Sequence, residues 1–402
     1  MSEDNRVIIV GAGPGGYTAA LNLAHYGIPF TLLEAEATIT DDPRAGTIHP
    51  PTLEMFAKLA LTGTLNDRGY IVRNYHYRDR KTGLVANFNL GVLSNETPYP
   101  YRLMLEQHKV SGIIDNALKN YENHVILRKH RVMEVEQNNE MVMAKVETPN
   151  GPTTFRGRYL IGCDGGRSQV RKFMNVNFAG FTFPERFLVV TTPYDFEKVG
   201  YAFTNYVSDP KEWCALFKVP GSDENGIWRV VFPTNPDLTK EEIFDDQNIE
   251  ARLQGFHPKS NSFPVVHRNL YEVHQRVASC YRDGRILLAG DAAHINNPLG
   301  GMGMNFGFHD VFNLTEKLAA IWLKNGDENL LDLYDRQRRT VAEEYLQRQT
   351  IENKKNLENK NPEAREAFHS ELRQIVADPD KARTYLRRAA MIEGIERAAA
   401  II

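Results

Sequence analysis

A glycine-rich turn near the start of the chain has the spacing that binds a dinucleotide. The letters GAGPGG at positions 11–16 match G-x-G-x-x-G. In this motif the first glycine permits a tight turn, the second lets a pyrophosphate approach the backbone, and the third lets helix and strand pack closely. An acid lies 18 residues after the last glycine, where its carboxylate can accept hydrogen bonds from ribose hydroxyls. The expected nucleotide contacts are Gly11, Gly13, Pro14, Gly16 and Glu34.

The residues on both sides of this turn have the pattern of a strand–helix–strand unit. Residues 7–10 are VIIV and residues 30–33 are FTLL, two apolar runs typical of parallel strands buried on both faces. Residues 17–25 have a helical pattern that ends before Gly27, a plausible helix-terminating glycine. The N–H groups at the start of such a helix attract a diphosphate. This unit by itself does not distinguish NAD from FAD.

A second turn, GCDGGRSQVR at positions 162–171, follows another apolar run at residues 159–163. The run predicts a buried strand, and Asp164 lies where that strand ends. A carboxylate there can hold a sugar hydroxyl or orient the backbone beside a cofactor. An Asp-Gly turn followed by a helix cap at Ser168 would produce the same letters for structural reasons alone.

A third turn, GDAAH at positions 290–294, again follows a predicted strand, residues 285–289. The segment NPLGGMGMN at positions 297–305 then leads into a long helical pattern, residues 306–323. The start of this helix favours the negative charge that a reduced flavin carries, and the glycines, Gly300 included, would let a flat isoalloxazine ring lie against the backbone. Three turns of this type favour FAD, with further expected contacts from Asp164, Asp291, Gly301, Gly303, Met304 and Asn305.

These three motifs resemble the signatures of the single-component, class A FAD-dependent aromatic hydroxylases, the family of p-hydroxybenzoate and phenol hydroxylases. The resemblance spans residues 7 to about 315. It implies FAD as the cofactor, with NADPH or NADH as a transient reductant that has no second nucleotide-binding domain. In agreement, the chain contains one G-x-G-x-x-G. The resemblance adds Arg44 after the second strand, with Arg102 and Gln107 on a helix after residues 98–100, and we also place Val132 among the cofactor contacts.

The chemistry that the resemblance implies is hydroxylation of an aromatic ring by O₂ through a flavin C4a-hydroperoxide, which must be protected from water. It places Pro298, Gly300 and Gly301 beside the reacting edge of the flavin, where backbone N–H groups could hold the peroxide. A phenol-like or N-heterocyclic substrate must also be activated as an electron-rich ring. The candidates for this role are His49 and His76, with Tyr194, Tyr201 and Tyr206 as phenol partners; His49 is our choice.

Aromatic and β-branched residues dominate positions 181–273 and predict an antiparallel sheet inserted into the nucleotide-binding fold. A mostly aromatic pocket on this sheet would suit a planar, apolar ligand. Arg229 could pair with a substrate carboxylate, or it could be a solvated strand residue. The expected substrate contacts are Tyr201, Phe203, Tyr206, Trp213, Phe217, Arg229 and Pro298.

The elements that must position these residues predict an α/β protein. We expect a Rossmann-like FAD-binding domain, an inserted antiparallel β-sheet substrate domain and a helical C-terminal region. The expected bounds are 1–70, 100–180 and 275–335 for the first, 71–99 and 181–274 for the second, and 336–402 for the third. Further expected elements are helices at 51–60 and 101–121 and strands at 124–127, 132–137 and 141–147.

The overall composition indicates neither a nucleic acid nor a membrane as a partner. The net charge is −3, and no apolar run approaches the roughly 18 residues that predict a membrane span. The three cysteines lie far apart and predict neither disulfides nor a metal site. We expect a cytoplasmic enzyme whose partners are a small aromatic substrate and O₂. The charged tail is interpreted as either the surface of a homodimer or a solvated cap.

Other functions share parts of this pattern. A flavin-dependent quinone-ring hydroxylase or prenyl-chain reductase would act on a more lipophilic substrate through the same fold. An NAD-dependent dehydrogenase would use the first turn but would not account for the other two. A non-catalytic flavin-binding protein would not consume NAD(P)H. A flavin-dependent halogenase would carry a W-x-W-x-I-P segment, which the sequence lacks.

Overall fold

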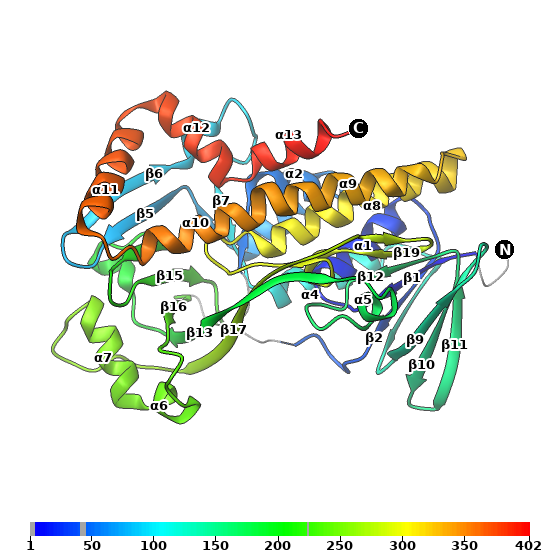
Figure 1. Ribbon diagram of the computed structural model, residues 1–402, viewed down its shortest axis with the longest axis horizontal. Helices are drawn as coiled ribbons and strands as arrows, with labels where there is room; N and C mark the ends of the chain where they lie inside the picture. The colour runs from blue at the N-terminus through cyan, green and yellow to red at the C-terminus, as the bar shows by residue number, and fades with distance from the viewer. Residues whose placement is uncertain (1–4, 41–45, 223–224) are drawn as a thin grey trace.

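The computed structural model describes residues 5–40, 46–222 and 225–402. Two sheet regions lie next to each other, and helices from the C-terminal part of the chain, orange to red in Figure 1, lie along one side of both. This arrangement confirms the predicted α/β fold with a parallel sheet, a second sheet region and a helical C-terminal part.

The nucleotide-binding region is built on a six-stranded sheet that is parallel except at one edge. Its strand order is β18 (Arg282–Asp283), β19 (Ile286–Leu288), β12 (Tyr159–Gly162), β1 (Val7–Val10), β2 (Phe30–Glu34) and β8 (His124–Arg128). The central strands are buried on both faces, which is why their sequences are unbroken apolar runs. Because β1, β12 and β19 are neighbours running in the same direction, the three turns after them open at one edge of the sheet.

Helices cover this sheet and connect its parallel strands. Helix α1 (Pro14–His25) connects β1 to β2 and packs against α4 (Gln107–Leu118) and α8 (Gly303–Lys324). A small antiparallel sheet follows β8 and contains β9 (Arg131–Gln137), β10 (Val142–Thr148) and β11 (Gly151–Gly157). The strands at 132–137 and 141–147 are thus confirmed, whereas β11 was not predicted.

The second region is an eight-stranded sheet. Its order is β20 (His294–Ile295), β17 (His267–Ala278), β13 (Phe178–Thr192), β16 (Ile227–Pro233), β15 (Cys214–Val219), β14 (Thr204–Ser208), β5 (Asn74–Asp79) and β6 (Gly83–Asn89). All neighbouring pairs are antiparallel except β14 and β5, which run parallel. The sheet is therefore mixed, because the β5–β6 hairpin joins its edge from an earlier part of the chain.

The two faces of this sheet contact different parts of the molecule. One face carries Tyr206 and Val231 and shares an apolar cluster with Leu299 and the C-terminal helices. The other face carries Leu216 and Trp228 and is covered by α6 (Lys240–Phe244) and α7 (Asp246–Phe256). Only the first face is turned towards the loop that follows the third turn.

A three-stranded sheet joins the two regions and corrects one sequence prediction. It contains β3 (Thr47–Ile48), β7 (Arg102–Met104) and β4 (Tyr70–Val72), with β7 in the middle. We predicted a single helix over residues 101–121, but α4 begins only at Gln107. Pairing of β7 with strands on both sides outweighs its local helical pattern. Arg102 therefore lies on a strand, which decides where its side chain points.

The remaining helices follow the predicted pattern with shorter bounds. We predicted a helix at 51–60, but α2 ends before Ala60, which has a left-handed φ of 56°. The predicted helical tail is confirmed. These helices are α2 (Pro50–Ala57), α3 (Thr62–Arg68), η1 (Leu90–Leu93), α5 (Gln169–Phe173), η2 (Phe196–Val199), η3 (Gly290–Ala292), α9 (Asn329–Val341), the π-helical η4 (Ala342–Gln347), α10 (Arg348–Leu357), α11 (Pro362–Ala377), α12 (Pro379–Ala389) and α13 (Ile392–Ala399). In the described ranges, none of the helices has both the length and the apolar character that a bilayer crossing requires.

Candidate active site

The first glycine turn has room for a diphosphate only where the motif requires it. A Cβ atom on Gly16 would lie 1.8 Å from the carbonyl oxygen of Gly11, and one on Gly11, whose φ is 95°, would lie 2.6 Å from that of Cys163. A Cβ atom on Gly13 would meet no described atom within 4 Å. Helix α1 starts at Pro14 without a side-chain cap. The open space over Gly13 and the N–H groups of the first helical turn fit the diphosphate of a dinucleotide.

Glu34 contacts the backbone of the same turn. One carboxylate oxygen accepts a hydrogen bond from the N–H of Ala12 at 2.5 Å, and the other from the N–H of Glu36 at 2.7 Å. Each oxygen retains a further lone pair that a ribose hydroxyl can use. The geometry therefore gives Glu34 a contact to the backbone of the turn that the sequence did not predict, while its contact to a ribose stays a prediction.

The second turn is organised by its own acid. Asp164 accepts hydrogen bonds from the Ser168 hydroxyl at 2.5 Å and from the N–H groups of Gln169 at 2.6 Å and Val170 at 3.1 Å. Burial raises the pKa of Asp164, although these hydrogen bonds act in the opposite direction. The Ser168 hydroxyl in turn accepts a hydrogen bond from the N–H of Arg171 at 2.9 Å and caps α5. This geometry matches both orientation of the backbone and the purely structural turn that the sequence also left open.

Arg171 ties the second turn to the third, a role that the sequence analysis missed. Its guanidinium donates to the carbonyl of Gly166 at 2.7 Å and to that of Ala292 at 2.8 Å. The residue lies in the SQVR letters of the second motif, but its partner is more than a hundred positions away. The two turns therefore form one unit.

The third turn is supported by a buried carboxylate that was not predicted either. Asp310 on α8 accepts hydrogen bonds from the N–H of Gly290 at 3.0 Å and from the Arg338 guanidinium at 2.7 Å, and it lies 2.7 Å from Nε2 of His294. Asp310 is fully buried. Burial alone would raise the pKa of Asp310, but His294 and Arg338 hold it below its ordinary value. Two predicted site residues of this loop, Asp291 and Pro298, are by contrast exposed.

Asn305 locks the loop after the third turn to the segment before α2. Its amide nitrogen donates to the carbonyls of Gly301 at 2.8 Å and Thr47 at 2.9 Å. Its amide oxygen accepts from the N–H of His49 at 2.9 Å and from the Thr52 hydroxyl at 2.8 Å. The loop also approaches Thr47 closely, since a Cβ atom on Gly301 would lie 2.7 Å from the Thr47 Cβ.

His49 is a buried neutral histidine beside this loop. Burial, followed by the positive charge of Arg102, holds the pKa of His49 well below its ordinary value. Its Nε2 lies 3.0 Å from the carbonyl oxygen of Gly300, so the neutral ring carries its proton on Nε2 and donates it there. Nδ1 is then an acceptor, and it has no hydrogen-bond partner among the described residues.

Three of the predicted substrate contacts lie together on the sheet face turned towards the loop. Tyr206 meets Phe217 edge-on, with ring centroids 6.1 Å apart, and Phe217 is the cross-strand neighbour of Arg229. Burial lowers the pKa of Arg229, and the charge of Glu106 opposes this effect. Phe203 belongs to an adjoining cluster that also contains Phe217.

Another predicted contact, Tyr201, lies elsewhere, which corrects the expected pocket. Tyr201 precedes β14 and packs edge-on to Phe196 at 5.7 Å, in the cluster on the opposite face. Trp213, by contrast, belongs to the same apolar cluster as Tyr206, Phe217 and Leu299, where it packs against Phe187 at 5.1 Å. The position of Tyr201 was not predictable, because this residue precedes β14 and so lies outside the strand alternation.

The other candidates for a proton acceptor are also on the far side. His76 accepts a hydrogen bond from the N–H of Ala202 at 3.3 Å, and burial together with the charge of Arg78 lowers its pKa to about 4. The Tyr194 hydroxyl lies 3.1 Å from Nε2 of His257, among the neighbours of Tyr201.

The remaining predicted cofactor contacts are distributed as follows. Gln107 is the first residue of α4 and is half-buried. Gly303 is the first residue of α8, and Met304 follows it with partial exposure. Val132 is buried in the core beneath the parallel sheet. Arg44 lies at positions 41–45, outside the described residues.

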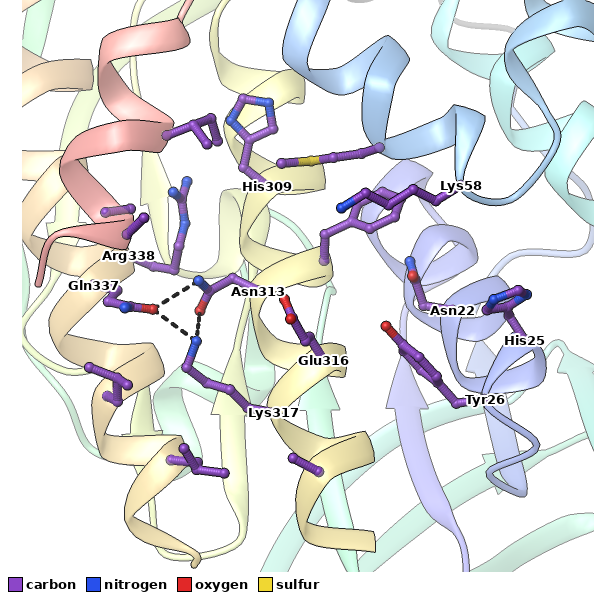
Figure 2. Close-up of a pocket in the computed structure, with 18 of the residues that line it drawn as sticks. Asn22, His25, Tyr26, Lys58, His309, Asn313, Glu316, Lys317, Gln337 and Arg338 are labelled. Carbon is purple, nitrogen blue, oxygen red and sulfur yellow. Dashed lines mark hydrogen bonds between the residues drawn. The ribbon is translucent and has the colours of Figure 1, made fainter. Parts of the chain in front are cut away.

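A hollow of about 610 Å³ lies away from these turns, among α1, α2, α8, α9 and α13 (Figure 2). On its wall the Lys317 ammonium donates to Asn313 and Gln337, both at 2.8 Å. Burial lowers the pKa of Lys317 to about 8. The apolar and amide-rich walls of this hollow share no residue with the three turns.

In the described ranges no three His, Cys, Asp or Glu side chains are grouped to hold a metal ion.

Comparisons with known proteins agree with this geometry. The family model described as FAD binding domain matches residues 4–349. The para-nitrophenol 4-monooxygenase of Pseudomonas sp. (strain WBC-3) is 37% identical over 84% of this chain and 84% of its own. The 6-hydroxy-3-succinoylpyridine 3-monooxygenase HspB of Pseudomonas putida (strain DSM 28022 / S16) is 33% identical over 96% of this chain and 98% of its own.

A solved structure shows the same architecture. The crystal structure of p-nitrophenol 4-monooxygenase PnpA from Pseudomonas putida DLL-E4 superposes with a TM-score of 0.92 at 31% identity, covering 97% of this chain and 98% of that one. These matches leave no support for an NAD-dependent dehydrogenase. With its three turns meeting at one sheet edge, this chain belongs to the FAD binding domain family and is an FAD-dependent aromatic monooxygenase of class A.

Proposed function

We propose that the chain hydroxylates a small aromatic ring that already carries a hydroxyl group, either a phenol or a hydroxypyridine. The observation that carries this proposal is the meeting of the loop with the aromatic face, because Leu299 lies in one apolar cluster with Tyr75 and Tyr206. Apolar and aromatic surfaces of this kind bind flat rings. The relatives support the class, since one is named for p-nitrophenol and another for a hydroxypyridine.

We propose that FAD is held across the three turns at the edge of the parallel sheet. Bound FAD supplies the ring that NADPH or NADH reduces and that transfers one oxygen atom from O₂ to the substrate. The open space over Gly13 and the uncapped start of α1 fit its diphosphate. The contacts proposed from the sequence and compatible with these positions are Gly11, Gly13, Pro14, Gly16, Glu34, Gln107, Asp164, Asp291, Gly301, Gly303, Met304 and Asn305.

The residues of this chain then orient the substrate and exclude water. Leu299, Tyr206 and Phe217 form an apolar wall that keeps water from the reacting edge. His49 holds the Gly300 carbonyl through Nε2, so it sets the conformation of the loop and keeps one buried acceptor, Nδ1, for the substrate side. Pro298, Gly300 and Gly301 are the proposed backbone contacts at the reacting edge.

The bounds of the two domains, predicted from the sequence, remain a proposal. We propose that residues 71–99 and 181–274 bind the substrate, although β13 and β17 continue beyond those limits to Phe178 and Ala278. A cytoplasmic location and a homodimer are proposed from the sequence alone.

The test is a substrate panel with the FAD-loaded protein. Phenols, hydroxypyridines and unhydroxylated arenes are compared for accelerated NAD(P)H oxidation, ¹⁸O incorporation from ¹⁸O₂ and H₂O₂ release. We expect labelled product with little H₂O₂ from at least one hydroxylated ring. Labelled product only from long-chain quinones, or none from any hydroxylated ring, would refute the proposal.

A further inference from the structure

Arg102 is a buried cation without a counter-ion. The residue is 2% exposed and lies on β7. One guanidinium nitrogen, Nη2, donates to the carbonyl of Ala389 at 3.3 Å. Nε and Nη1 have no hydrogen-bond partner among the described residues, and no carboxylate of that part of the chain forms an ion pair with the guanidinium. Removing such a group from water is costly unless an anion compensates it.

The surroundings of Arg102 are aromatic and electrically neutral. Its guanidinium lies 4.4 Å from the centre of the Tyr75 ring, and Tyr206 meets the same ring edge-on at 6.2 Å. Burial raises the pKa of Tyr75, and it raises the pKa of Tyr385 on α12 to about 12, so both hydroxyls keep their protons at neutral pH. The titratable side chains that sense the charge of Arg102 are His49, Tyr75, Tyr345 and Tyr385.

Arg102 also borders the reacting side of the loop. It is close enough to His49 to lower the pKa of that histidine, and His49 in turn contacts the Gly300 carbonyl. Its stacking partner Tyr75 belongs to the apolar cluster that contains Leu299. The elements that hold Arg102, β5 and α12, lie outside the parallel sheet that carries the dinucleotide turns. This position favours the substrate over the cofactor as its ligand.

We infer that Arg102 binds the ring oxyanion of the substrate, so that the enzyme takes a hydroxyarene as its phenolate. This inference rests on the proposed function and names the ionisation state that the site selects. The anion supplies the negative counter-charge that Arg102 lacks, and its oxygen supplies the hydrogen-bond acceptor that Nε and Nη1 lack. Binding of a neutral phenol then releases one proton to solvent, and the phenolate ring is the electron-rich form that oxygen transfer requires.

The experiment uses the FAD-loaded protein and 4-nitrophenol, whose anion alone absorbs visible light. Its absorbance is titrated against pH when free and when bound to wild-type, Arg102→Met, Arg102→Lys and Arg252→Met proteins. We expect the bound ligand to titrate about one pH unit or more below the free ligand in wild type. Arg102→Met should abolish this shift and weaken phenolate binding at least about tenfold, and Arg102→Lys should keep part of it.

Two controls separate the possible failures. Arg252→Met removes a largely buried arginine of α7, which pairs with Glu212 on the opposite face of the eight-stranded sheet, and should retain the shift; loss of the shift there but not in Arg102→Met would overturn the inference. Binding of 4-nitroanisole, which cannot ionise, should change less than about twofold in Arg102→Met.

Flavin content, read from the visible spectrum, should equal that of wild type; loss of FAD from both Arg102 variants would assign the residue to the cofactor and overturn the inference. An unshifted ligand in wild type that nevertheless gives hydroxylated product would refute the inference and leave the proposed function standing. Failure of every hydroxyarene to bind would refute both the inference and the proposed function.

Discussion

The side-chain oxygen of Asn305 accepts a hydrogen bond from the backbone N–H of His49 at 2.9 Å, across 256 positions of the chain. The same amide contacts Gly301, Thr47 and Thr52. One side chain therefore holds the loop after the third turn against the segment that presents His49. The conformation of this loop depends on this clamp.

Asn305→Ala tests the clamp. The variant removes four hydrogen bonds and leaves buried backbone groups without partners, so we expect a loss of about 1–3 kcal/mol in unfolding free energy. We also expect more H₂O₂ per NAD(P)H consumed, because a looser loop admits water. Denaturant unfolding and peroxide assays measure both. Asn313→Ala on the same helix, whose amide contacts Gln337, should leave the peroxide yield unchanged; equal leakage in both variants would contradict the role of Asn305.

Two glycines of the first turn should respond differently to an added side chain. Gly13→Val points into open space with an ordinary φ of −72°, so the apoprotein should fold while FAD binding weakens at least tenfold, or about 1.4 kcal/mol. Gly16→Ala would place Cβ 1.8 Å from the Gly11 carbonyl and should destabilise the apoprotein itself. Thermal melting without FAD and fluorescence titration with FAD distinguish the two effects. A Gly13→Val protein with normal FAD affinity would show that the diphosphate lies elsewhere.

Asp310 should contribute stability that depends on pH. Asp310→Asn leaves the buried Arg338 without its counter-ion, so we expect a loss of about 3–5 kcal/mol at pH 7. The folded-state pKa of Asp310 is depressed, so its contribution is present above the unfolded-state pKa of about 3.9 and is lost as the pH falls through the folded value.

The difference in unfolding free energy between wild type and Asp310→Asn should therefore shrink below about pH 4. Urea unfolding at a series of pH values measures it, with the half-buried helix cap Asp378→Asn as the control. A difference that stays constant down to pH 3 would contradict a depressed pKa.

His49 should act through its Nε2 proton and not through titration near neutral pH. Glutamine can present an N–H to the Gly300 carbonyl, whereas alanine cannot. We expect His49→Ala to release several-fold more H₂O₂ and His49→Gln to stay near wild type. Because the pKa of His49 lies well below 6.5, both wild type and His49→Gln should show the same pH profile of coupling between pH 6 and 8. If the coupling of wild type changed between pH 6 and 8 and that of His49→Gln did not, His49 would have to titrate during turnover.

Part of this architecture is readable from local sequence. The runs at 7–10 and 159–163 are apolar throughout because parallel strands are buried on both faces, and each ends in a glycine turn at the sheet edge. The prediction of a helix over residues 101–121 was wrong at its start, because the RLM segment at 102–104 pairs with a strand on each side. No local pattern encodes that pairing.

The sequence by itself determined the cofactor class and the common edge of its binding site, because strand, turn and helix signals are periodic and local. Only the tertiary structure decided what the side chains around that edge do. Arg171, Asp310 and Asn305 find partners in distant segments, and Arg102 meets Tyr75 of β5 and Tyr385 of α12 from opposite ends of the chain. Periodicity tells which face of its own element a residue occupies, whereas its partners depend on how elements far apart in the chain pack together.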